Sequence, residues 1–127
     1  MNILGHGIDL VPIAELQRWI DDARNPLIPR CFTQSELSQI GDGPDRIARI
    51  AGRFAAKEAV LKALGTGFGA GVAFTDVEIS REDGAPPTVH LTGGAAAAAN
   101  LRGISSWHLS ISHTRELAMA SAIAVGP

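Results

Sequence analysis

RFAAKEAVLKALGTG, which spans residues 53–67, is the stretch that determines the fold of this chain. Ala, Leu, Lys and Glu favour helix strongly, whereas glycine is costly inside one. The stretch therefore predicts a helix that runs into a turn containing Gly65 and Gly67. The residues before it extend the helix back to about Arg46. We expect one long helix around which the other segments are organised.

One stripe of this helix carries two charges among apolar residues. At about 100° per residue, five side chains fall close to a common line, namely Ile47, Ala51, Phe54, Glu58 and Lys62. A carboxylate that faces the core loses its hydration and must be neutralised, paired or bound to a cation. Lys62, four residues after Glu58, is the local candidate for that partner.

The far side of the same helix carries a basic ridge, formed by Arg46, Arg49, Arg53 and Lys57. A ridge of this kind is more often a solvated helix face than a binding site. The alternative is contact with an acidic partner or a phosphate.

Length and composition indicate a single ordinary domain. The chain has 127 residues, 46% of them apolar and 19% charged, and a formal net charge of −2 that gives no sign of a nucleic-acid partner. Cys31 is the lone cysteine, so neither an intramolecular disulfide nor a cysteine-based metal site can form. The chain lacks an apolar run of about 18 residues and a secretory signal, so we expect no membrane segment and a cytoplasmic location.

The N-terminal segment, residues 2–10, is apolar and interrupted by Gly5 and Gly7. It predicts a strand whose glycines mark a bulge or a close approach of another backbone. The strand ends at Asp9, directly before a helix whose first turn contains Pro12. Position alone favours Asp9 as a helix-capping or turn residue. The alternative is a carboxylate presented at a strand end, where ligands often bind.

The remaining segments predict short elements. Two prolines indicate a loop at residues 25–29, and the capping box of Thr33 and Glu36 opens a short helix that ends at about Ile40. Alternating apolar residues predict two pairs of strands, at residues 72–80 and 88–92 and at residues 107–113 and 117–125.

A short alanine-rich helix closed by Gly103 is expected between the two pairs of strands. One face of the last strand is alanine only, so a helix or another subunit can pack closely on it. His113 ends the expected buried face of the strand at residues 107–113. A histidine there is usually a hydrogen-bonded structural residue, and the alternative is contact with a phosphate or a hydroxyl.

The residues alone suggest chemistry on a phosphate. Residues 65–71 are dense in glycine, and their amides could cradle phosphate oxygens within reach of Lys62. As a lone signal the pattern is weak, and its ordinary explanation is a helix C-cap with a flexible loop. Asp9 and Glu58 are hard oxygen ligands with no sulfur or imidazole beside them, which suits Mg²⁺. The hypothesis is magnesium-assisted chemistry on a phosphate ester or diphosphate.

Five segments, in this order and spacing, resemble the holo-acyl-carrier-protein synthase family of 4′-phosphopantetheinyl transferases: GIDLVPIAEL, RCFTQSEL, RFAAKEAVLKALGTGFGAG, FTDVEI and HLSISHT. The similarity runs from about Ile3 to Val125. It implies an α+β fold, with a long central helix packed against a small antiparallel sheet, in one domain over residues 1–127. It also implies a homotrimer with active sites between subunits. The implied reaction transfers the phosphopantetheine arm from coenzyme A to a serine of apo acyl carrier protein and releases adenosine 3′,5′-bisphosphate.

The resemblance also implies roles for individual residues. Asp9 and Glu58 would be the Mg²⁺ ligands and, with Lys62, the catalytic set. The base that removes the serine proton stays open between Asp9, Glu58 acting through water, and hydroxide on the metal. The diphosphate would be held by Lys62 and the turn after it, which comprises Gly65, Thr66 and Gly67. The coenzyme A phosphates would also be reached by Arg53, His113 and Thr114.

One position departs from the family pattern. The first helix has Glu15 where the family commonly has a basic residue that meets the acidic carrier protein. Arg18, Arg24 and Arg30 remain nearby, so recognition would use shifted arginines or a different carrier, such as that of a polyketide or peptide synthase. The main competing class is a non-catalytic module that binds coenzyme A or a carrier protein, and a second is a magnesium-dependent phosphohydrolase.

Overall fold

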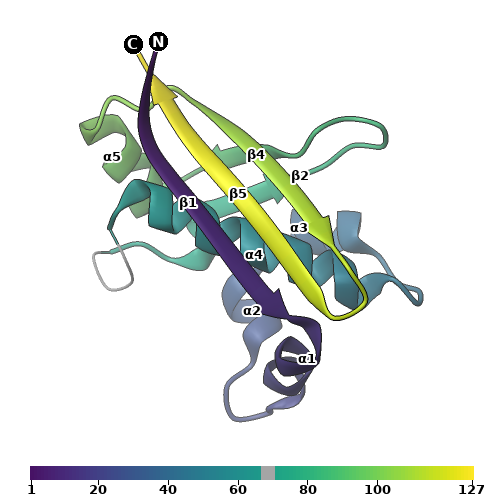
Figure 1. Ribbon diagram of the computed structural model, residues 1–127. Helices are drawn as coiled ribbons and strands as arrows, with labels where there is room; N and C mark the ends of the chain where they lie inside the picture. The colour runs from purple at the N-terminus through teal and green to yellow at the C-terminus, as the bar shows by residue number, and fades with distance from the viewer. Residues whose placement is uncertain (67–70) are drawn as a thin grey trace.

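The structure of the protein, a computed structural model, describes residues 1–66 and 71–127 (Figure 1). In chain order the elements are β1 (Asn2–Pro12), α1 (Ile13–Asp21), α2 (Leu27–Cys31), α3 (Gln34–Ile40), α4 (Arg46–Leu64), the 3₁₀ turn η1 (Phe74–Asp76), β2 (Val77–Ser80), β3 (Thr88–Leu91), α5 (Gly93–Leu101), β4 (Ser106–His113) and β5 (Leu117–Gly126).

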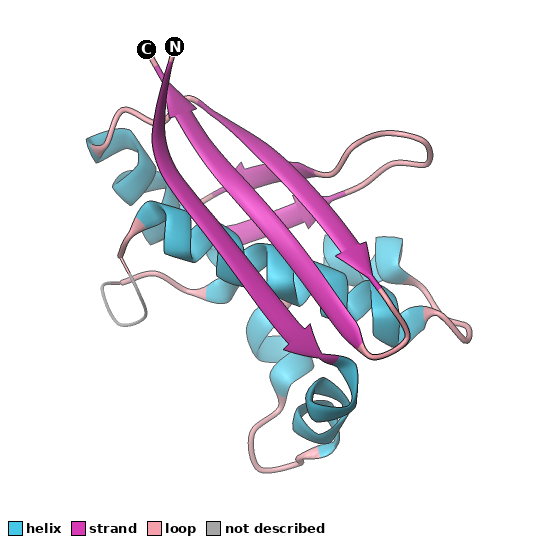
Figure 2. Cartoon of the chain, in the orientation of Figure 1, coloured by secondary structure: helices cyan, strands magenta, loops and turns pink. Residues whose placement is uncertain are grey.

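Within the described residues, the larger sheet has the antiparallel order β1-β5-β4, and β2 pairs with β3 in a separate hairpin. Figure 2 shows α4 lying across one face of the larger sheet, with the hairpin on the other side of the helix. The fold is therefore α+β, with a long helix packed on a small antiparallel sheet, as the sequence predicts.

The alanine face of β5 is the surface on which α4 packs. Four alanines of this strand are fully buried, namely Ala118, Ala120, Ala122 and Ala124. Their small side chains let the helix approach the sheet closely, which confirms the prediction that a helix can pack there. The opposite face of the same sheet has no helix over it in Figure 1.

Gly5 and Gly7 bring β1 against α4. A Cβ atom at Gly7 would overlap the carbonyl oxygen of Ala59, and one at Gly5 would overlap that of Ala63. The strand also has a register shift between Ile3 and Gly5. Both predicted roles of the glycines, a bulge and a close approach of another backbone, are thus present in one strand.

Two boundaries differ from the prediction. Residues 25–29 are not all loop, because α2 begins at Leu27 and contains Pro29. A proline is tolerated there, since Pro29 lies in the first helical turn, where its missing N–H would have no partner within the helix. The strand expected at 72–80 begins only at Val77, because η1 precedes it and the Asp76 carboxylate accepts the backbone N–H of Ala73 at 3.1 Å.

The capping box is confirmed at the start of α3. The Thr33 hydroxyl accepts the backbone N–H of Glu36 at 3.2 Å, and the Glu36 carboxylate accepts that of Thr33 at 3.0 Å. The other boundaries of the predicted strands and helices agree with the structure to within a few residues. In the part of the chain that the structure describes, no helix is both long and apolar enough to cross a membrane.

Candidate active site

Asp9 and Lys62 meet where β1 crosses α4. Lys62 Nζ lies 2.9 Å from Asp9 Oδ1 and donates a second hydrogen bond, also 2.9 Å, to the carbonyl oxygen of Ile8. The Asp9 side chain is mostly buried, whereas that of Lys62 is about half exposed. Lys62 therefore pairs with Asp9, and not with Glu58 as its helical spacing suggested.

Glu58 lies one turn before Lys62 on the same helix and is half-buried. Burial and the nearby Asp9 carboxylate raise the pKa of Glu58, and Lys62 opposes that shift. Among the described residues, Glu58 has neither a hydrogen-bond nor an ion-pair partner. The carboxylates of Asp9 and Glu58 and the ammonium group of Lys62 are thus close enough to interact electrostatically. The Glu58 carboxylate, which has no partner among the described residues, can bind a cation.

This donor set fits a hard divalent cation. Mg²⁺ binds one or two carboxylates and completes its shell with waters and phosphate oxygens. Asp9 and Glu58 supply two carboxylates, and no group of three or more His, Cys, Asp and Glu side chains suited to a metal occurs among the described residues. A transition-metal site built from nitrogen and sulfur ligands is accordingly not indicated in this part of the chain.

The turn after α4 is held in place by Arg102. The helix ends at Leu64 and is capped by Gly65, which has the left-handed φ of 74°. Arg102 Nη1 donates to the carbonyl oxygens of Ala63 at 2.7 Å and Leu64 at 2.8 Å, and its other amino group reaches the carbonyl of Leu4. Sequence reasoning missed Arg102, because no local pattern connects the end of α5 with the end of α4.

Thr66 follows Gly65 with a hydroxyl that is buried and has no hydrogen-bond partner in the described structure. A hydroxyl in this condition can donate to a ligand oxygen. Gly67, the third member of the predicted turn, lies outside the described residues.

A second cluster surrounds Arg53 and His113. Arg53 is buried, and its Nε atom lacks a partner among the described residues. Burial lowers the pKa of Arg53, Glu36 opposes this, and the guanidinium groups of Arg49 and Arg81 lower it further. These three arginines and His113 line a cavity of about 90 Å³. The positive charge gathered around this small cavity makes the cluster a candidate phosphate site.

His113 differs from its prediction, because it is exposed at the end of β4 rather than buried. Its Nδ1 atom lies 3.3 Å from the carbonyl oxygen of Thr114. Both residues line a larger cavity of about 470 Å³ between the starts of α1 and α4 and the β4–β5 turn.

The predicted site residues thus form two groups within one chain. Glu58 and Arg53 lie five positions apart on α4, which places their side chains about 140° apart around the helix axis. Asp9 is on β1 and His113 on β4, and these strands are the opposite edges of the sheet (Figure 1). Among the described residues, Asp9, Glu58 and Lys62 lie close enough to interact electrostatically, and His113 lines one cavity with Arg53 and another with Thr114.

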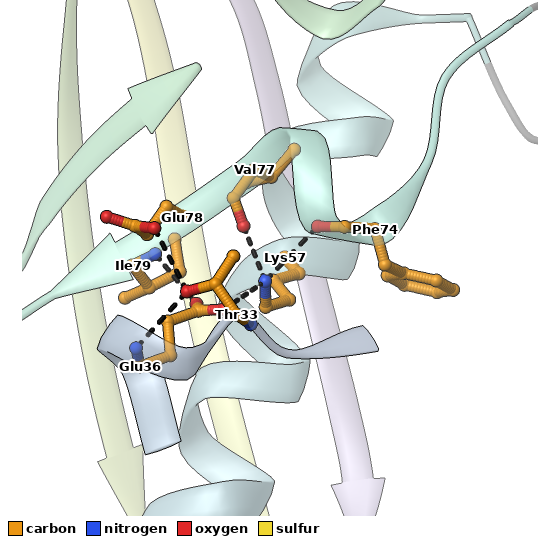
Figure 3. A network of polar contacts seen from close by, with 7 residues as sticks. All are labelled: Thr33, Glu36, Lys57, Phe74, Val77, Glu78 and Ile79. Carbon is orange, nitrogen blue, oxygen red and sulfur yellow. Dashed lines mark hydrogen bonds and ion pairs between the residues drawn. The ribbon is translucent and has the colours of Figure 1, made fainter. Parts of the chain in front are cut away.

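Lys57 corrects the prediction of a solvated basic ridge. Its side chain is 0% exposed and its Nζ atom lies 2.7 Å from Oε1 of Glu36, which is 1% exposed. Figure 3 shows the same Nζ atom donating to the carbonyl oxygens of Phe74 at 3.1 Å and Val77 at 2.5 Å. All three ammonium hydrogens therefore have acceptors, which offsets the cost of burying the charge.

The Glu36 carboxylate extends this network to β2. Its Oε2 atom accepts the backbone N–H of Ile79 at 2.9 Å, while the Thr33 hydroxyl donates to Glu78 at 2.9 Å. Burial lowers the pKa of Lys57 and Glu36 opposes that shift. The network ties α3, α4, η1 and β2 together directly behind Glu58, the next residue after Lys57.

A cavity of about 380 Å³ opens on the side of α4 that carries Glu58. Its apolar walls come from three elements and include Leu27 of α2, Phe54 of α4 and Phe74 of η1. The rings of Phe54 and Phe74 are stacked with centroids 5.5 Å apart. Glu58 therefore lies beside a largely apolar space.

Comparison with known proteins agrees with this fold along nearly the whole chain. A family model described as ACPS, 4′-phosphopantetheinyl transferase superfamily, matches residues 5–122. A holo-[acyl-carrier-protein] synthase of Desulforudis audaxviator is 46% identical over 125 residues, which cover 98% of this chain and 95% of that protein. One of Koribacter versatilis is 40% identical over 121 residues, covering 95% and 97% of the two chains.

Solved structures give the same result. The crystal structure of Helicobacter pylori holo-[acyl-carrier-protein] synthase in complex with coenzyme A has a TM-score of 0.81 and 31% identity, covering 94% of this chain and 99% of that chain. The enzyme of Neisseria meningitidis has a TM-score of 0.85 and 29% identity, covering 98% and 99%. The implied fold is confirmed, and the chain belongs to the 4′-phosphopantetheinyl transferase superfamily.

Proposed function

We propose that the protein transfers the 4′-phosphopantetheine group of coenzyme A to a serine of apo acyl carrier protein. The observation that carries this proposal is the convergence of Asp9, Glu58 and Lys62 where β1 crosses α4, in a chain of this superfamily. A protein that only bound coenzyme A would have no need of two carboxylates held near each other with one unpartnered.

In this reaction the serine oxygen forms a bond to the phosphorus that carries the arm. The bond from that phosphorus to the bridging oxygen of the diphosphate breaks, and adenosine 3′,5′-bisphosphate leaves with the electron pair. The serine proton passes to a carboxylate of the site, directly or through water.

Asp9 and Glu58 would hold Mg²⁺ beside the diphosphate. The support is chemical, since these are two oxygen donors of which one has no partner among the described residues. When bound, the ion supplies charge neutralisation at the diphosphate. Asp9 is oriented by its ion pair with Lys62, and Glu58 by the rigid helix on which it lies.

Lys62, Gly65 and Thr66 would bind the diphosphate. Lys62 contributes a half-exposed ammonium group and Thr66 a hydroxyl without a partner in the described part of the chain. Arg102 would assist by occupying the last carbonyls of α4, because otherwise the negative end of the helix dipole would oppose a bound anion. Gly67 is proposed for the same role from its place in the motif alone.

Arg53, His113 and Thr114 would bind the remaining phosphate of coenzyme A. Since they lie apart from Asp9 and Glu58 within one chain, one subunit would supply the first group and its neighbour the second. We therefore propose a homotrimer with shared sites.

The outer face of the β1-β5-β4 sheet supports self-association. Leu10 is 59% exposed, Ile8 48% and Met119 39%, and Leu10 lies directly opposite Met119 in the register. Exposed apolar side chains that are adjacent on an uncovered sheet face are typical of a protein interface.

The carrier protein would dock near α1, with Arg18, Arg24 and Arg30 compensating for Glu15. Coenzyme A and the carrier as substrates would place the reaction in the cytoplasm, and one domain over residues 1–127 would perform it.

The decisive experiment mixes the protein with apo acyl carrier protein, coenzyme A and Mg²⁺ and measures the carrier by mass spectrometry. The proposal predicts a mass gain equal to one phosphopantetheine group, dependent on the metal. No gain on fatty-acid, polyketide or peptide-synthase carriers would instead favour a binding module. Consumption of coenzyme A in the absence of any carrier would favour a phosphohydrolase.

A further inference from the structure

Two histidines lie in one row across the larger sheet. In the register, Ile123 of β5 is opposite both His6 of β1 and His108 of β4. Cross-strand partners point to the same face of a sheet, so these three side chains, here called the histidine row, share one face. Both histidines are exposed, and the Nε2 atom of His6 lies 3.3 Å from the Ser121 hydroxyl on the same face. No helix covers that face in Figure 1.

The two histidines are the titratable side chains of this uncovered face. Among the residues of β1, β4 and β5, all of which the structure describes, the other two titratable side chains are Asp9 and His113. Asp9 is opposite Ala120 and His113 opposite Ala118, and these alanines belong to the face on which α4 packs. Apart from the histidine row, the uncovered face consists of apolar and hydroxyl side chains, which include Ile8, Leu10, Ser106, Ser110, Ser112, Leu117, Met119 and Ser121.

Charged groups on the neighbouring elements lie away from the histidine row. α4 and the β2–β3 hairpin are on the other side of the sheet (Figure 2), and Arg102 is bound there to the last carbonyls of α4. α1 and the β4–β5 turn are at the Pro12 end of β1, roughly 20 Å along the strand from His6. The groups concerned are Arg46, Arg49, Arg53, Lys57, Glu58 and Lys62 of α4, Glu78, Arg81, Glu82, Asp83 and His90 of the hairpin, Glu15, Arg18 and Asp21 of α1, and Arg115 and Glu116 of the turn. Among the described residues, neither histidine of the row therefore faces a carboxylate.

A homotrimer with shared sites would enclose this face. One chain would supply Asp9 on β1 and its neighbour His113 on β4, so that opposite edges of two sheets meet. The sheet face between those edges would then be covered by copies of itself, and three copies bring six imidazoles together without a carboxylate. Removing an imidazolium from water is costly and like charges repel, so such an assembly favours the neutral imidazole.

We propose that the histidine row makes self-association depend on pH, and that protonation of His6 and His108 releases the trimer as folded single chains. The inference rests on the proposed function, because it takes further copies of this chain as what covers the sheet. It adds a regulatory device to that function. Since neighbouring chains complete each other's sites, loss of assembly switches off transfer in mildly acidic surroundings.

The direction and size of the effect follow from proton linkage. An ordinary histidine has a pKa of about 6.5, so an exposed one is protonated roughly ten to one at pH 5.5. A trimer that accepts only neutral imidazole loses a factor of about ten in its association constant for each histidine. Six histidines weaken that constant up to about a million-fold between pH 7.5 and pH 5.5. Because three chains associate, the chain concentration at half-assembly rises up to about a thousandfold.

Sedimentation velocity over a dilution series at pH 7.5 and pH 5.5 measures this concentration. The native chain should need at least about 100-fold more protein for half-assembly at pH 5.5, while circular dichroism shows that the released chains stay folded. His6→Gln combined with His108→Gln keeps two polar side chains that do not bind a proton, so this double variant should assemble equally at both pH values. His90→Gln, the same change at an exposed histidine of β3, is the matched control and should keep the full acid response.

Three results would overturn the inference: equal half-assembly of the native chain at the two pH values, release of unfolded chains, or an undiminished acid response in the double variant. Should the double variant fail to assemble at pH 7.5, the single variants decide. Each retains three of the six imidazoles, so its shift should fall to about 10–30-fold, and a native shift in both would also overturn the inference.

The proposed function fails in a different way. A single chain at every concentration at pH 7.5 would overturn the homotrimer and this inference together, whereas a trimer without an acid response would overturn this inference alone. An intact acid response without any mass gain on a carrier at pH 7.5 would support the histidine row and overturn the transfer reaction alone.

Discussion

Lys62 Nζ on α4 lies 2.9 Å from Asp9 Oδ1 on β1, although 53 positions separate the two residues in sequence. The contact exists because glycines at positions 5 and 7 let the strand lie against the helix backbone. The place where strand and helix cross therefore determines the geometry of the candidate active site.

Replacing Asp9 by asparagine should reduce phosphopantetheine transfer by at least about 100-fold, because the amide keeps the shape but loses the charge needed to bind a cation. The carrier mass assay, run at equal protein concentration, measures this effect. Asp83→Asn, the same change in the exposed β2–β3 turn, is the matched control and should retain full activity. Asp9→Asn activity close to that of the native protein would contradict the assigned role.

Gly7→Ala should separate β1 from α4, since the added Cβ atom would overlap the Ala59 carbonyl oxygen. We expect a loss of about 1–3 kcal/mol in the free energy of unfolding, together with a fall in transfer because Asp9 moves with the strand. Urea denaturation and the carrier assay measure the two effects.

Gly41→Ala is the control for Gly7→Ala, because it introduces backbone strain without an overlap with another backbone. Gly41 has a positive φ of 64° with no atom near its missing Cβ, so alanine there should cost stability without altering transfer. Equal losses of transfer in the two variants would show that the contact of β1 with α4 is not what positions the site.

Local patterns in the sequence predicted much of this architecture. The helix formers of α4, the Thr33–Glu36 capping box and the alternation of β4 and β5 each act over a few residues, and the structure confirms all three. Gly5 and Gly7 signalled the close approach of a backbone without showing which one. Local patterns could not predict the pairing of Asp9 with Lys62, because it depends on how β1 is positioned along α4.

The buried charges were the main failure of sequence reasoning. Helical spacing placed Lys57 on a basic ridge with three arginines, and such ridges are usually solvated. Its burial depends on α3 and β2 covering that side of α4 and on Glu36 supplying the opposite charge. The periodicity of α4 does not indicate that Lys57 is buried or that it pairs with Glu36. The sequence showed only a glutamate in a capping box and a lysine on a helix.

The Lys57–Glu36 pair should show strong coupling in a double-mutant cycle. Lys57→Met alone and Glu36→Gln alone each leave an unpaired buried charge, and each should cost about 3–5 kcal/mol of unfolding free energy. The double variant has no charge at either position, and the amide oxygen introduced at position 36 can still accept a backbone N–H group, from Thr33 or Ile79. It should be more stable than either single variant in urea denaturation, and simple additivity would contradict the coupling.

Cys31 should react slowly with alkylating agents. Burial raises the pKa of its thiol from 9.0 to about 11, so little thiolate is present near neutral pH. Iodoacetamide modification at mildly alkaline pH, followed by intact mass, should be roughly 100-fold slower in the folded protein than in urea. Comparable rates in the two conditions would show that the thiol is accessible and that its pKa is not raised.

The same shift affects stability at high pH. Because the folded pKa lies above the ordinary value, the stabilisation from the neutral thiol is complete below about pH 9 and is lost as the pH rises toward about 11. The alkylation rate of the folded protein should rise over that interval.

Shared active sites predict complementation between two inactive chains. Asp9→Asn removes a member of one group of site residues and His113→Ala a member of the other, so each variant alone should be inactive or nearly so. In a mixed trimer, an interface between the intact Asp9 of one chain and the intact His113 of its neighbour would be restored. Co-refolding the two variants should therefore recover a substantial fraction of native transfer, whereas mixing either variant with itself should not.

Met119→Glu provides the control for assembly, because a charge on the uncovered sheet face should prevent association. Solution mass should shift from three copies of the 13.3 kDa chain to one, and Met119→Glu combined with either inactive variant should abolish complementation. Leu101→Glu, a charge at an exposed apolar position on α5, should leave both mass and complementation intact. A fully active monomer would show that a single chain supplies both groups of site residues, and it would refute the shared site. Recovery of transfer only in the mixed sample, together with its loss in Met119→Glu, would establish that neighbouring subunits complete each other's sites.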